Sequence, residues 1–272
     1  MVDFQCKSRY DWEDLVEIIR ILRAPGGCPW DGEQTHLSIR RCFLEETYEV
    51  LDALDRDDPR DMCEELGDVL MQVVFHAQIE RERGRFDVSD VIDGVAQKMV
   101  FRHPHVFGGG MEADTSEEVL VNWEILKRKE KDQRSTADAI EAVPHTLPAL
   151  WRAEKVQKKT AKVGFTYTET VDALKKLEEE VRELREALES GRSADAPHGV
   201  KEEVGDVLFM ACNVARMEGV EAEEALHCAC DKFNSRFRAV EQSADKPLDE
   251  CSKEELLALW RKAKENLDAK SV

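Results

Sequence analysis

The sequence predicts an all-α protein built from two tandem helical repeats. Hydrophobic residues recur with a period of about 3.6 residues along most of the chain, and no segment shows convincing strand alternation. Gly- and Pro-containing turns interrupt this pattern at intervals that suit helices of ordinary length. A set of acidic and apolar motifs also appears twice in the same order. Together these observations favour a helical unit that is present in two copies.

The helices are predicted in order from this periodicity, and turn residues separate them. The first three breaks lie at residues 24–29, 57–59 and 103–104, and the next two lie at 108–110 and 190–199. Each break contains Gly, Pro or a run of small polar residues, which end helices or start turns. The expected helices are 11–23, 37–55, 60–83, 88–102, 116–132, 147–162, 168–190, 200–218, 221–241 and 253–268.

Length and charge exclude several classes of protein. The chain has 272 residues, with 58 Asp and Glu against 39 Lys and Arg, which gives a formal net charge of −19. That length is enough for two domains of roughly 100–150 residues. Nucleic acid polymers and anionic membrane surfaces both need a basic footprint, so neither is expected as a partner. There is no long apolar run and no apolar leader, and the eight cysteines suit reduced thiols, so we expect a cytoplasmic protein.

The internal repeat defines the expected domains. Segment 45–49 recurs as 179–183, and segment 64–70 recurs as 202–208. Three later residues recur in the same order, with offsets that stay between 134 and 138 positions: Lys98, Arg102 and Trp123 become Lys232, Arg236 and Trp260. The expected division is an N-terminal unit at 1–132, a linker at 133–147 and a C-terminal unit at 148–272.

Paired carboxylates recur on the predicted helix faces of both units. Residues three apart lie on one face of a helix, so Glu180 and Glu183 flank the apolar stripe of their helix together. Glu203 and Asp206 have the same spacing on the next helix, at the edge of an apolar run. The equivalent acids of the first unit are Glu46, Glu49, Glu65 and Asp68. Two antiparallel helices would therefore bring four carboxylates to one place in each unit.

Four clustered carboxylates predict a divalent cation. Without a cation they would repel one another and their pKa values would rise. Oxygen ligands without nearby Cys or His favour Mg²⁺, with Mn²⁺ as a substitute. Gly67 and Gly205 lie inside these helices, where Gly costs roughly 1 kcal/mol relative to Ala. Close approach of a neighbouring helix or of a ligand would explain why both repeats carry Gly there.

A metal on carboxylates also makes a polyanionic nucleotide an acceptable ligand, because Mg²⁺ keeps coordination positions open for phosphate oxygens. Lys232 and Arg236 lie four apart on one predicted helix and are expected to face phosphates. Lys98 and Arg102 have the same spacing in the first unit. Trp260 is a candidate for stacking on a base, although core packing explains a Trp equally well.

These motifs resemble a known family. The pattern Glu-Glu-x-x-Glu, a spacer and Glu-x-x-Asp is similar to the signature of the all-α nucleoside triphosphate pyrophosphohydrolases, with spacers of 15 and 19 residues here. The tandem layout looks like that of the MazG family, as do segments 27–31 and 102–107. The resemblance covers roughly residues 11–268. It implies four-helix-bundle-like units, Mg²⁺-dependent hydrolysis of NTPs and dNTPs to the monophosphate and pyrophosphate, and a homodimer.

The resemblance also implies roles for individual residues, mainly in the C-terminal unit. There Glu180, Glu183, Glu203 and Asp206 would bind the metal, and Glu179 or Glu180 would orient or deprotonate the attacking water. The nucleotide contacts it implies are Lys176, Glu179, Lys232, Arg236 and Trp260. Asn213 of the second repeat aligns with Phe75 of the first, and only an amide can read a base or ribose. The first unit retains its four carboxylates, so metal binding is expected there too.

Two other readings remain open. A di-iron carboxylate bundle needs a Glu-x-x-His pair on each of two helices. The chain has Glu33 with His36 and Glu224 with His227, but these pairs occupy non-equivalent places in the repeat. A non-catalytic helical scaffold or regulatory partner would carry the same acids as solvated helix faces. The chain has no Gly-rich P-loop motif, which disfavours an NTPase that releases orthophosphate.

Overall fold

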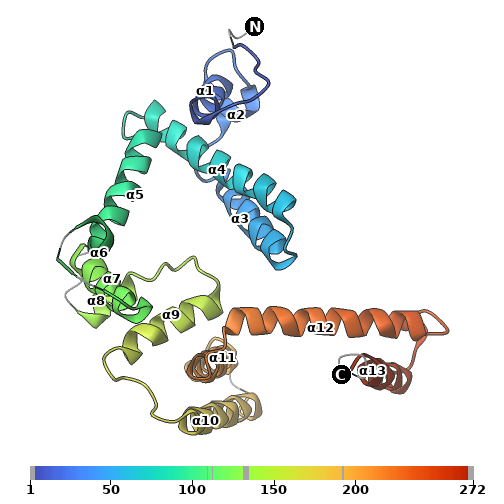
Figure 1. The fold of residues 1–272 in the computed structure, drawn as a ribbon. Helices are drawn as coiled ribbons and strands as arrows, with labels where there is room; N and C mark the ends of the chain where they lie inside the picture. The colour runs from blue at the N-terminus through green and yellow to red at the C-terminus, as the bar shows by residue number, and fades with distance from the viewer. Residues whose placement is uncertain (1–3, 109, 112, 131–134, 192, 269–272) are drawn as a thin grey trace. The chain divides into compact units, whose positions relative to one another are not determined.

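The protein is helical throughout the part that the structure describes. The computed structural model describes residues 4–108, 110–111, 113–130, 135–191 and 193–268, and these contain helices and turns without a strand (Figure 1). The chain divides into two compact units, Met1–Lys127 and Arg128–Val272, and each is described by itself. The prediction of an all-α fold is confirmed.

The first unit contains the helices α1 to α7. Asp residues start three of them: Asp11, Asp58 and Asp87 accept hydrogen bonds from backbone N–H groups of the first turns of α1, α4 and α5. The long helix α4 also begins with Pro59, which has the backbone angle that a first turn requires. The bounds are α1 Trp12–Arg23, α2 Pro29–Glu33, α3 Arg40–Asp55, α4 Pro59–Glu82, α5 Val88–Arg102, α6 Pro104–Phe107 and α7 Ser116–Glu130.

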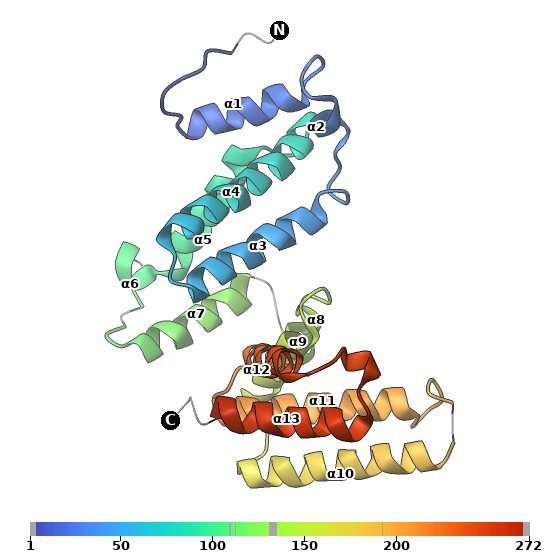
Figure 2. The ribbon, with the colours of Figure 1, turned by 90° about the vertical axis from the view of Figure 1, so that its right-hand side faces the viewer.

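The core of this unit lies where α1 and α5 pack against the C-terminal half of α4. Ile19 of α1, Val74 and Phe75 of α4, and Val88 of α5 are all at most 9% exposed. The N-terminal half of α4 instead pairs with α3, and Figure 2 shows these two helices side by side. One half of α4 therefore anchors the helix in the core, and the other half presents its side chains to α3.

The second unit contains α8 to α13. Its helices α10 and α11 form a hairpin like that of α3 and α4, and α9 packs against α11 (Figures 1 and 2). The pair α12 and α13 pack against each other, and α12 also contacts α9 and α11. The bounds are α8 Thr136–Glu141, α9 Ala149–Ala161, α10 Thr170–Glu189, α11 Val200–Met217, α12 Ala222–Ser243 and α13 Lys253–Asp268, with a 3₁₀ turn at Leu248–Glu250.

The predicted helices are present, and the short ones were not predicted. α2, α6 and the 3₁₀ turn have five residues or fewer, too few for a period of about 3.6 to be recognised. The predicted linker 133–147 contains α8, which begins with a capping box between Ser135 and Asp138. Residues 131–134, which include the end of the predicted helix 116–132, lie outside the described residues. Among the described residues, no helix combines the length and the apolar character needed to cross a membrane.

Candidate active site

Carboxylates of α10 and α11 converge in the second unit. Glu180, Glu203 and Asp206 each place one carboxylate oxygen within 4.8 Å of the others. Glu180 and Glu203 are only 6% and 4% exposed, whereas Asp206 is exposed. The α10–α11 hairpin brings these acids together. Residues three apart lie on one face of a helix, so Glu203 and Asp206 share the face of α11 that is opposite Glu180 of α10.

Burial, followed by repulsion within the cluster, raises the pKa values of two of these carboxyl groups. Burial is the main cause for Glu203, followed by the charges of Glu183 and Asp206. The pKa of Asp206 is raised by burial and then by the charge of Glu180. Glu183 is the fourth predicted ligand, and it lies outside the convergent trio but close enough to act on Glu203.

Lys176 lies one helical turn before the cluster. Its Nζ is 2.9 Å from Glu180 Oε1 and 3.3 Å from Glu179 Oε2, and these bonds raise the pKa of the ammonium. Glu179 is half-buried, and its carboxylate is also 3.8 Å from Arg182. The predicted phosphate contact Lys176 and the predicted metal ligand Glu180 therefore form one ion pair.

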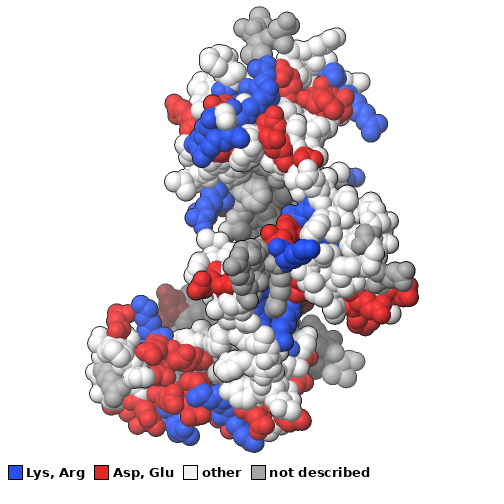
Figure 3. Space-filling view, turned by 90° about the vertical axis from the view of Figure 1, so that its left-hand side faces the viewer, with Lys and Arg blue, Asp and Glu red and all other residues white. Residues whose placement is uncertain are grey.

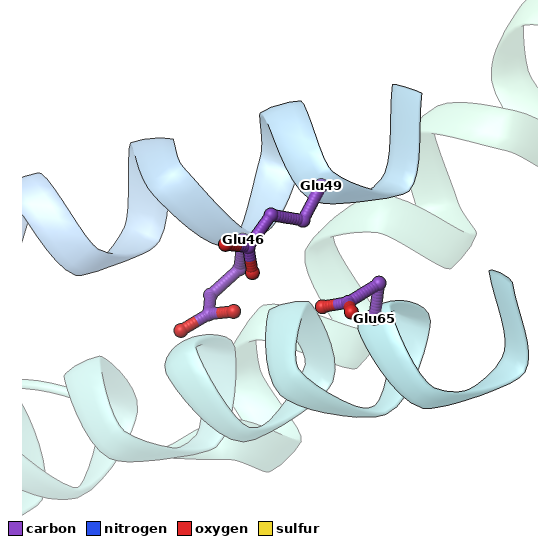
Figure 4. A group of neighbouring side chains, drawn as sticks. All are labelled: Glu46, Glu49 and Glu65. Carbon is purple, nitrogen blue, oxygen red and sulfur yellow. The ribbon is translucent and has the colours of Figure 1, made fainter. Parts of the chain in front are cut away.

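The first unit repeats the cluster on α3 and α4. Glu46, Glu49 and Glu65 each place one oxygen within 4.8 Å of the others. Figure 4 shows these three side chains between the two helices. Burial and then the charges of Asp68 and Glu49 raise the pKa of Glu46. Burial and then the charge of Glu49 raise the pKa of Glu65. Asp68 lies outside the trio, as Glu183 does in the second unit.

Both clusters suit a hard divalent cation. All of their donors are carboxylate oxygens, which Mg²⁺ and Mn²⁺ prefer. Each cluster also holds like charges close together at raised pKa, a condition that a bound cation relieves. In the second unit Glu180, Glu203 and Asp206, with Glu183 beside them, are the residues that could hold such an ion.

The remaining predicted nucleotide contacts lie on other helices. Lys232 and Arg236 are on α12, and Trp260 is on α13 with its ring 5.1 Å from Phe233. These three residues therefore belong to the α12–α13 pair, whereas the acids belong to the α10–α11 hairpin (Figure 1). Asn213 is buried on α11, two turns after Asp206.

The two helix glycines differ from the expectation. A Cβ built at Gly67 or Gly205 would meet no atom of the described residues within 4 Å, so no described helix of the unit approaches closely there. Of the two explanations predicted for these glycines, close approach of a helix of the same unit is therefore wrong, and close approach of a ligand stays a prediction.

One neighbour of the cluster was missed by sequence reasoning. His198 lies in the turn before α11, with φ 53°, and its Nδ1 is 3.8 Å from Glu203 Oε1. It belongs to the segment 190–199, which has no helical periodicity that could place a side chain.

The face of the second unit seen at the bottom of Figure 3 is rich in acidic side chains, with Lys and Arg scattered among them.

Comparison with known proteins identifies the family. The MazG nucleotide pyrophosphohydrolase domain matches twice, at residues 34–107 and 169–240, so each match contains one acidic hairpin. The chain is 45% identical to the nucleoside triphosphate pyrophosphohydrolase of Escherichia coli K12 over 84% of this chain and 86% of that protein. It is 41% identical to the Thermotoga maritima nucleoside triphosphate pyrophosphohydrolase/pyrophosphatase MazG, over 93% and 95% of the two chains.

A third relative is the uncharacterised Bacillus subtilis protein YabN. It is 45% identical over 94% of this chain, which corresponds to 52% of YabN. The two domain matches confirm the tandem repeat, and the similarity to the first two relatives extends over most of each protein. The chain therefore belongs to the MazG nucleotide pyrophosphohydrolase family.

Proposed function

We propose that the protein hydrolyses nucleoside triphosphates, both NTPs and dNTPs, to the monophosphate and pyrophosphate with Mg²⁺. The observation that carries this proposal is the convergence of Glu180, Glu203 and Asp206 beside Lys176. This arrangement offers carboxylates for a metal and a cation for phosphate within one hairpin. The printed names of the Escherichia coli and Thermotoga maritima relatives support the same activity.

In this proposal, different residues of the second unit bind the metal, stabilise the phosphates and orient the attacking water. Glu180, Glu183, Glu203 and Asp206 hold Mg²⁺, which when bound polarises phosphoryl oxygens and lowers the pKa of a bound water. Lys176 stabilises negative charge on the phosphates, as cations do in phosphoryl transfer. Glu179 or Glu180 orients the attacking water or takes its proton. Glu179 is the more available of the two for this role, because its carboxylate is not part of the trio that could hold the metal.

The two units differ in ways that favour the second as the main catalytic unit. With the offset of 134 that relates Glu46 to Glu180, the position of Lys176 is Cys42 in the first unit. Phe75 replaces Asn213. The first unit thus retains its carboxylates but lacks an ammonium at the position of Lys176 and an amide at the position of Asn213. We infer that it binds metal and contributes less to turnover.

A homodimer is part of the proposal. Large apolar side chains are exposed on the hairpin and on α12, among them Leu174 and Leu188 of α10, Leu208 of α11 and Phe237 of α12. Exposed apolar faces of this kind are typical of surfaces that pack against another chain. Sedimentation equilibrium of the full chain tests this point, and a mass equal to the monomer's 31.1 kDa would contradict it.

The cellular setting follows from the same features. The net charge of −19 and the acidic face in Figure 3 support a small nucleotide as partner rather than a nucleic acid polymer or a membrane. We propose a cytoplasmic enzyme that removes or regulates nucleotides in the pool. Expression of the protein in a host whose nucleotide pools are then measured tests this role, and unchanged pools would contradict it.

The test of the activity is a panel of the common NTPs and dNTPs with and without Mg²⁺. Pyrophosphate and orthophosphate are measured separately in each reaction. We expect pyrophosphate and the monophosphate in equal amounts, and only with the metal. Release of orthophosphate alone would contradict the proposal. No product from any nucleotide, with thermal stability insensitive to Mg²⁺, would favour the scaffold reading.

The di-iron reading has little support in the structure. His36 is hydrogen-bonded to Glu80 at 2.5 Å and to His76 at 2.7 Å, and these residues lie apart from the acid trio of the first unit. His227 is exposed on α12. Absorbance of iron in the purified protein would revive this alternative.

A further inference from the structure

The second unit contains a cavity whose lining includes Asn213 together with residues that have no assigned role so far. It has a volume of about 410 Å³ and lies between α9, α11 and the loop that follows α9. Its lining combines apolar groups, two threonines and Arg216 with aromatic and amide side chains, namely Gln157, Phe165, Tyr167, Phe209 and Asn213. Aromatic faces and amide groups are the side chains that recognise a planar heteroaromatic ring.

Gln157 gives this cavity an unused hydrogen-bond acceptor. Its Nε2 donates to the backbone oxygen of Phe209 at 2.7 Å, which fixes the orientation of the amide, since only the nitrogen can donate to a carbonyl. Its Oε1 is buried and has no hydrogen-bond partner among the described residues. The whole residue is 5% exposed. A buried acceptor without a partner is costly, so it indicates a group that a ligand satisfies.

Asn213 provides the matching donor. Its Oδ1 accepts from Arg216 Nη2 at 2.7 Å and from Nε at 3.3 Å, so its Nδ2 hydrogens are what it can offer to a ligand. Arg216 Nη2 also donates to Thr166 Oγ1 at 2.9 Å, so the guanidinium is hydrogen-bonded to the loop that follows α9. The cavity therefore presents an amide acceptor and an amide donor among aromatic and apolar groups, and the Arg216 guanidinium in its wall is already hydrogen-bonded to Asn213 and Thr166. This combination suits the polar edge of a base.

The cavity is placed at a suitable distance from the acids. Asn213 and Asp206 are seven residues apart on α11, so they share a face and are separated by about 10 Å along the helix axis. That separation is comparable to the span of a nucleotide from its α-phosphate to its base. A triphosphate at Asp206 and Lys176 would thus have its base in reach of the cavity.

The first unit serves as an internal control. Phe75 stands at the position of Asn213, and the Arg23 guanidinium lies 4.9 Å from the centre of the Phe75 ring. Arg23 also donates to the backbone oxygens of Asp31 at 2.6 Å and Gln34 at 3.2 Å, and its side chain is 4% exposed. The position that carries the Asn213 amide in the second unit therefore carries an aromatic ring stacked with Arg23 in the first.

From these observations we propose that the cavity binds the base of the nucleotide substrate, and that Gln157 Oε1 reads an N–H group on the base edge. This inference rests on the proposed function and adds its specificity determinant. It explains why one repeat carries an amide at a position where the other carries Phe75, stacked with Arg23.

The experiment compares two pocket variants with a matched control in the full chain. Gln157→Leu removes the acceptor, and Asn213→Phe introduces the residue that the first unit carries there. Gln78→Leu removes another buried amide, which bonds Glu82 in the first unit, away from the cavity. For each protein, kcat/KM is measured with the preferred NTP, with its analogue lacking the base N–H, and with ribose 5-triphosphate, which has no base.

We expect both pocket variants to lower the ratio of kcat/KM for the NTP over ribose 5-triphosphate by about tenfold or more, mainly through KM. Gln157→Leu should also abolish discrimination between the NTP and the analogue without the N–H. Gln78→Leu should leave both ratios as in the wild type. Unchanged ratios in pocket variants that remain helical by circular dichroism would overturn the inference.

Failure of the proposed function would be recognised separately. If the wild-type protein hydrolyses no nucleotide, binding of free nucleosides is measured by saturation-transfer NMR. Binding that is lost in Asn213→Phe and retained in Gln78→Leu would support the base pocket without any hydrolysis. Binding that persists in Asn213→Phe, or no binding of any nucleoside, would overturn it.

Discussion

Lys176 Nζ lies 2.9 Å from Glu180 Oε1, so a cation and a buried carboxylate form an ion pair one helical turn apart on α10. Glu180 also belongs to the trio with Glu203 and Asp206. The ammonium therefore offsets part of the repulsion in the cluster, since its charge lowers the pKa of Asp206. The first unit has Cys42 at the position of Lys176.

Replacing Lys176 by Met should weaken substrate binding. We expect KM for NTPs to rise by roughly tenfold or more, because a charge-assisted contact to phosphate is lost. The matched control is Lys175→Met, since Lys175 is exposed and pairs with Asp172 at 2.8 Å on the same helix. Steady-state kinetics of the two variants decide the point. Equal KM values for both would show that Lys176 does not contact phosphate.

The stability of the metal-free protein should depend on Glu203. Its folded pKa is raised above the ordinary value of 4.5, so the folded state binds the proton more readily than the unfolded state. The contribution of this group to stability therefore falls as the pH rises above about 4.5 and is regained on acidification. Glu203→Gln should raise Tm in EDTA at about pH 7.5 by a few degrees, and by less at about pH 5.

In saturating Mg²⁺, the wild-type protein should instead have a higher Tm than Glu203→Gln. A ligand that binds only the folded state raises Tm, and the wild-type protein has one more carboxylate to offer than Glu203→Gln. Differential scanning calorimetry with Mg²⁺ and with EDTA provides both comparisons. A variant that is less stable than the wild type in EDTA, or that gains as much from Mg²⁺, would contradict a metal site at Glu203.

A histidine cluster in the first unit should make its stability sensitive to mild acid. Burial and then the charge of His36 lower the pKa of His76, which also packs edge-on against Phe43. The unfolded chain then takes up a proton near pH 6.5 before the folded chain does, so stability falls as the pH drops below that value. His36 Nε2 is hydrogen-bonded to Glu80, and this bond is the largest cause of the lowered pKa of the Glu80 carboxyl group. The stability that the Glu80 carboxylate contributes is therefore lost at a lower pH than the stability that depends on His76.

Urea unfolding of the full chain at about pH 7.5 and about pH 5.5 measures this effect. His76→Leu should lose less stability between the two pH values than the wild type does. His227→Leu replaces an exposed histidine on α12 and should behave like the wild type. If the variant at His76 keeps the full acid sensitivity, this half-buried imidazole is not its source.

The sequence was sufficient for the long helices and for most of the acid cluster. Glu180, Glu203 and Asp206 could be placed together because residues three apart share a helix face and because the motif occurs twice. The burial of Glu180 and Glu203 could not be predicted, since it depends on how closely α10 and α11 pack. Periodicity describes a face of one helix and contains no information on the helix opposite.

The cavity beside Gln157 illustrates the same limit. The residue belongs to the predicted helix 147–162, but nothing in its neighbours shows that its amide bonds the backbone of Phe209, far away in the sequence. Asn213 was recognised because Phe75 stands in its place in the other repeat. A difference between repeats therefore pointed to a candidate residue that the pattern of a single helix did not single out.

The most direct test of the account is pyrophosphate release by Glu180→Gln and Glu46→Gln, the equivalent substitutions in the two units, with NTP and Mg²⁺. Loss of a direct metal ligand should lower kcat of Glu180→Gln by at least about a hundredfold. Glu46→Gln should retain most of the wild-type rate. The opposite result, with activity lost in Glu46→Gln and retained in Glu180→Gln, would contradict the assignment of catalysis to the second unit.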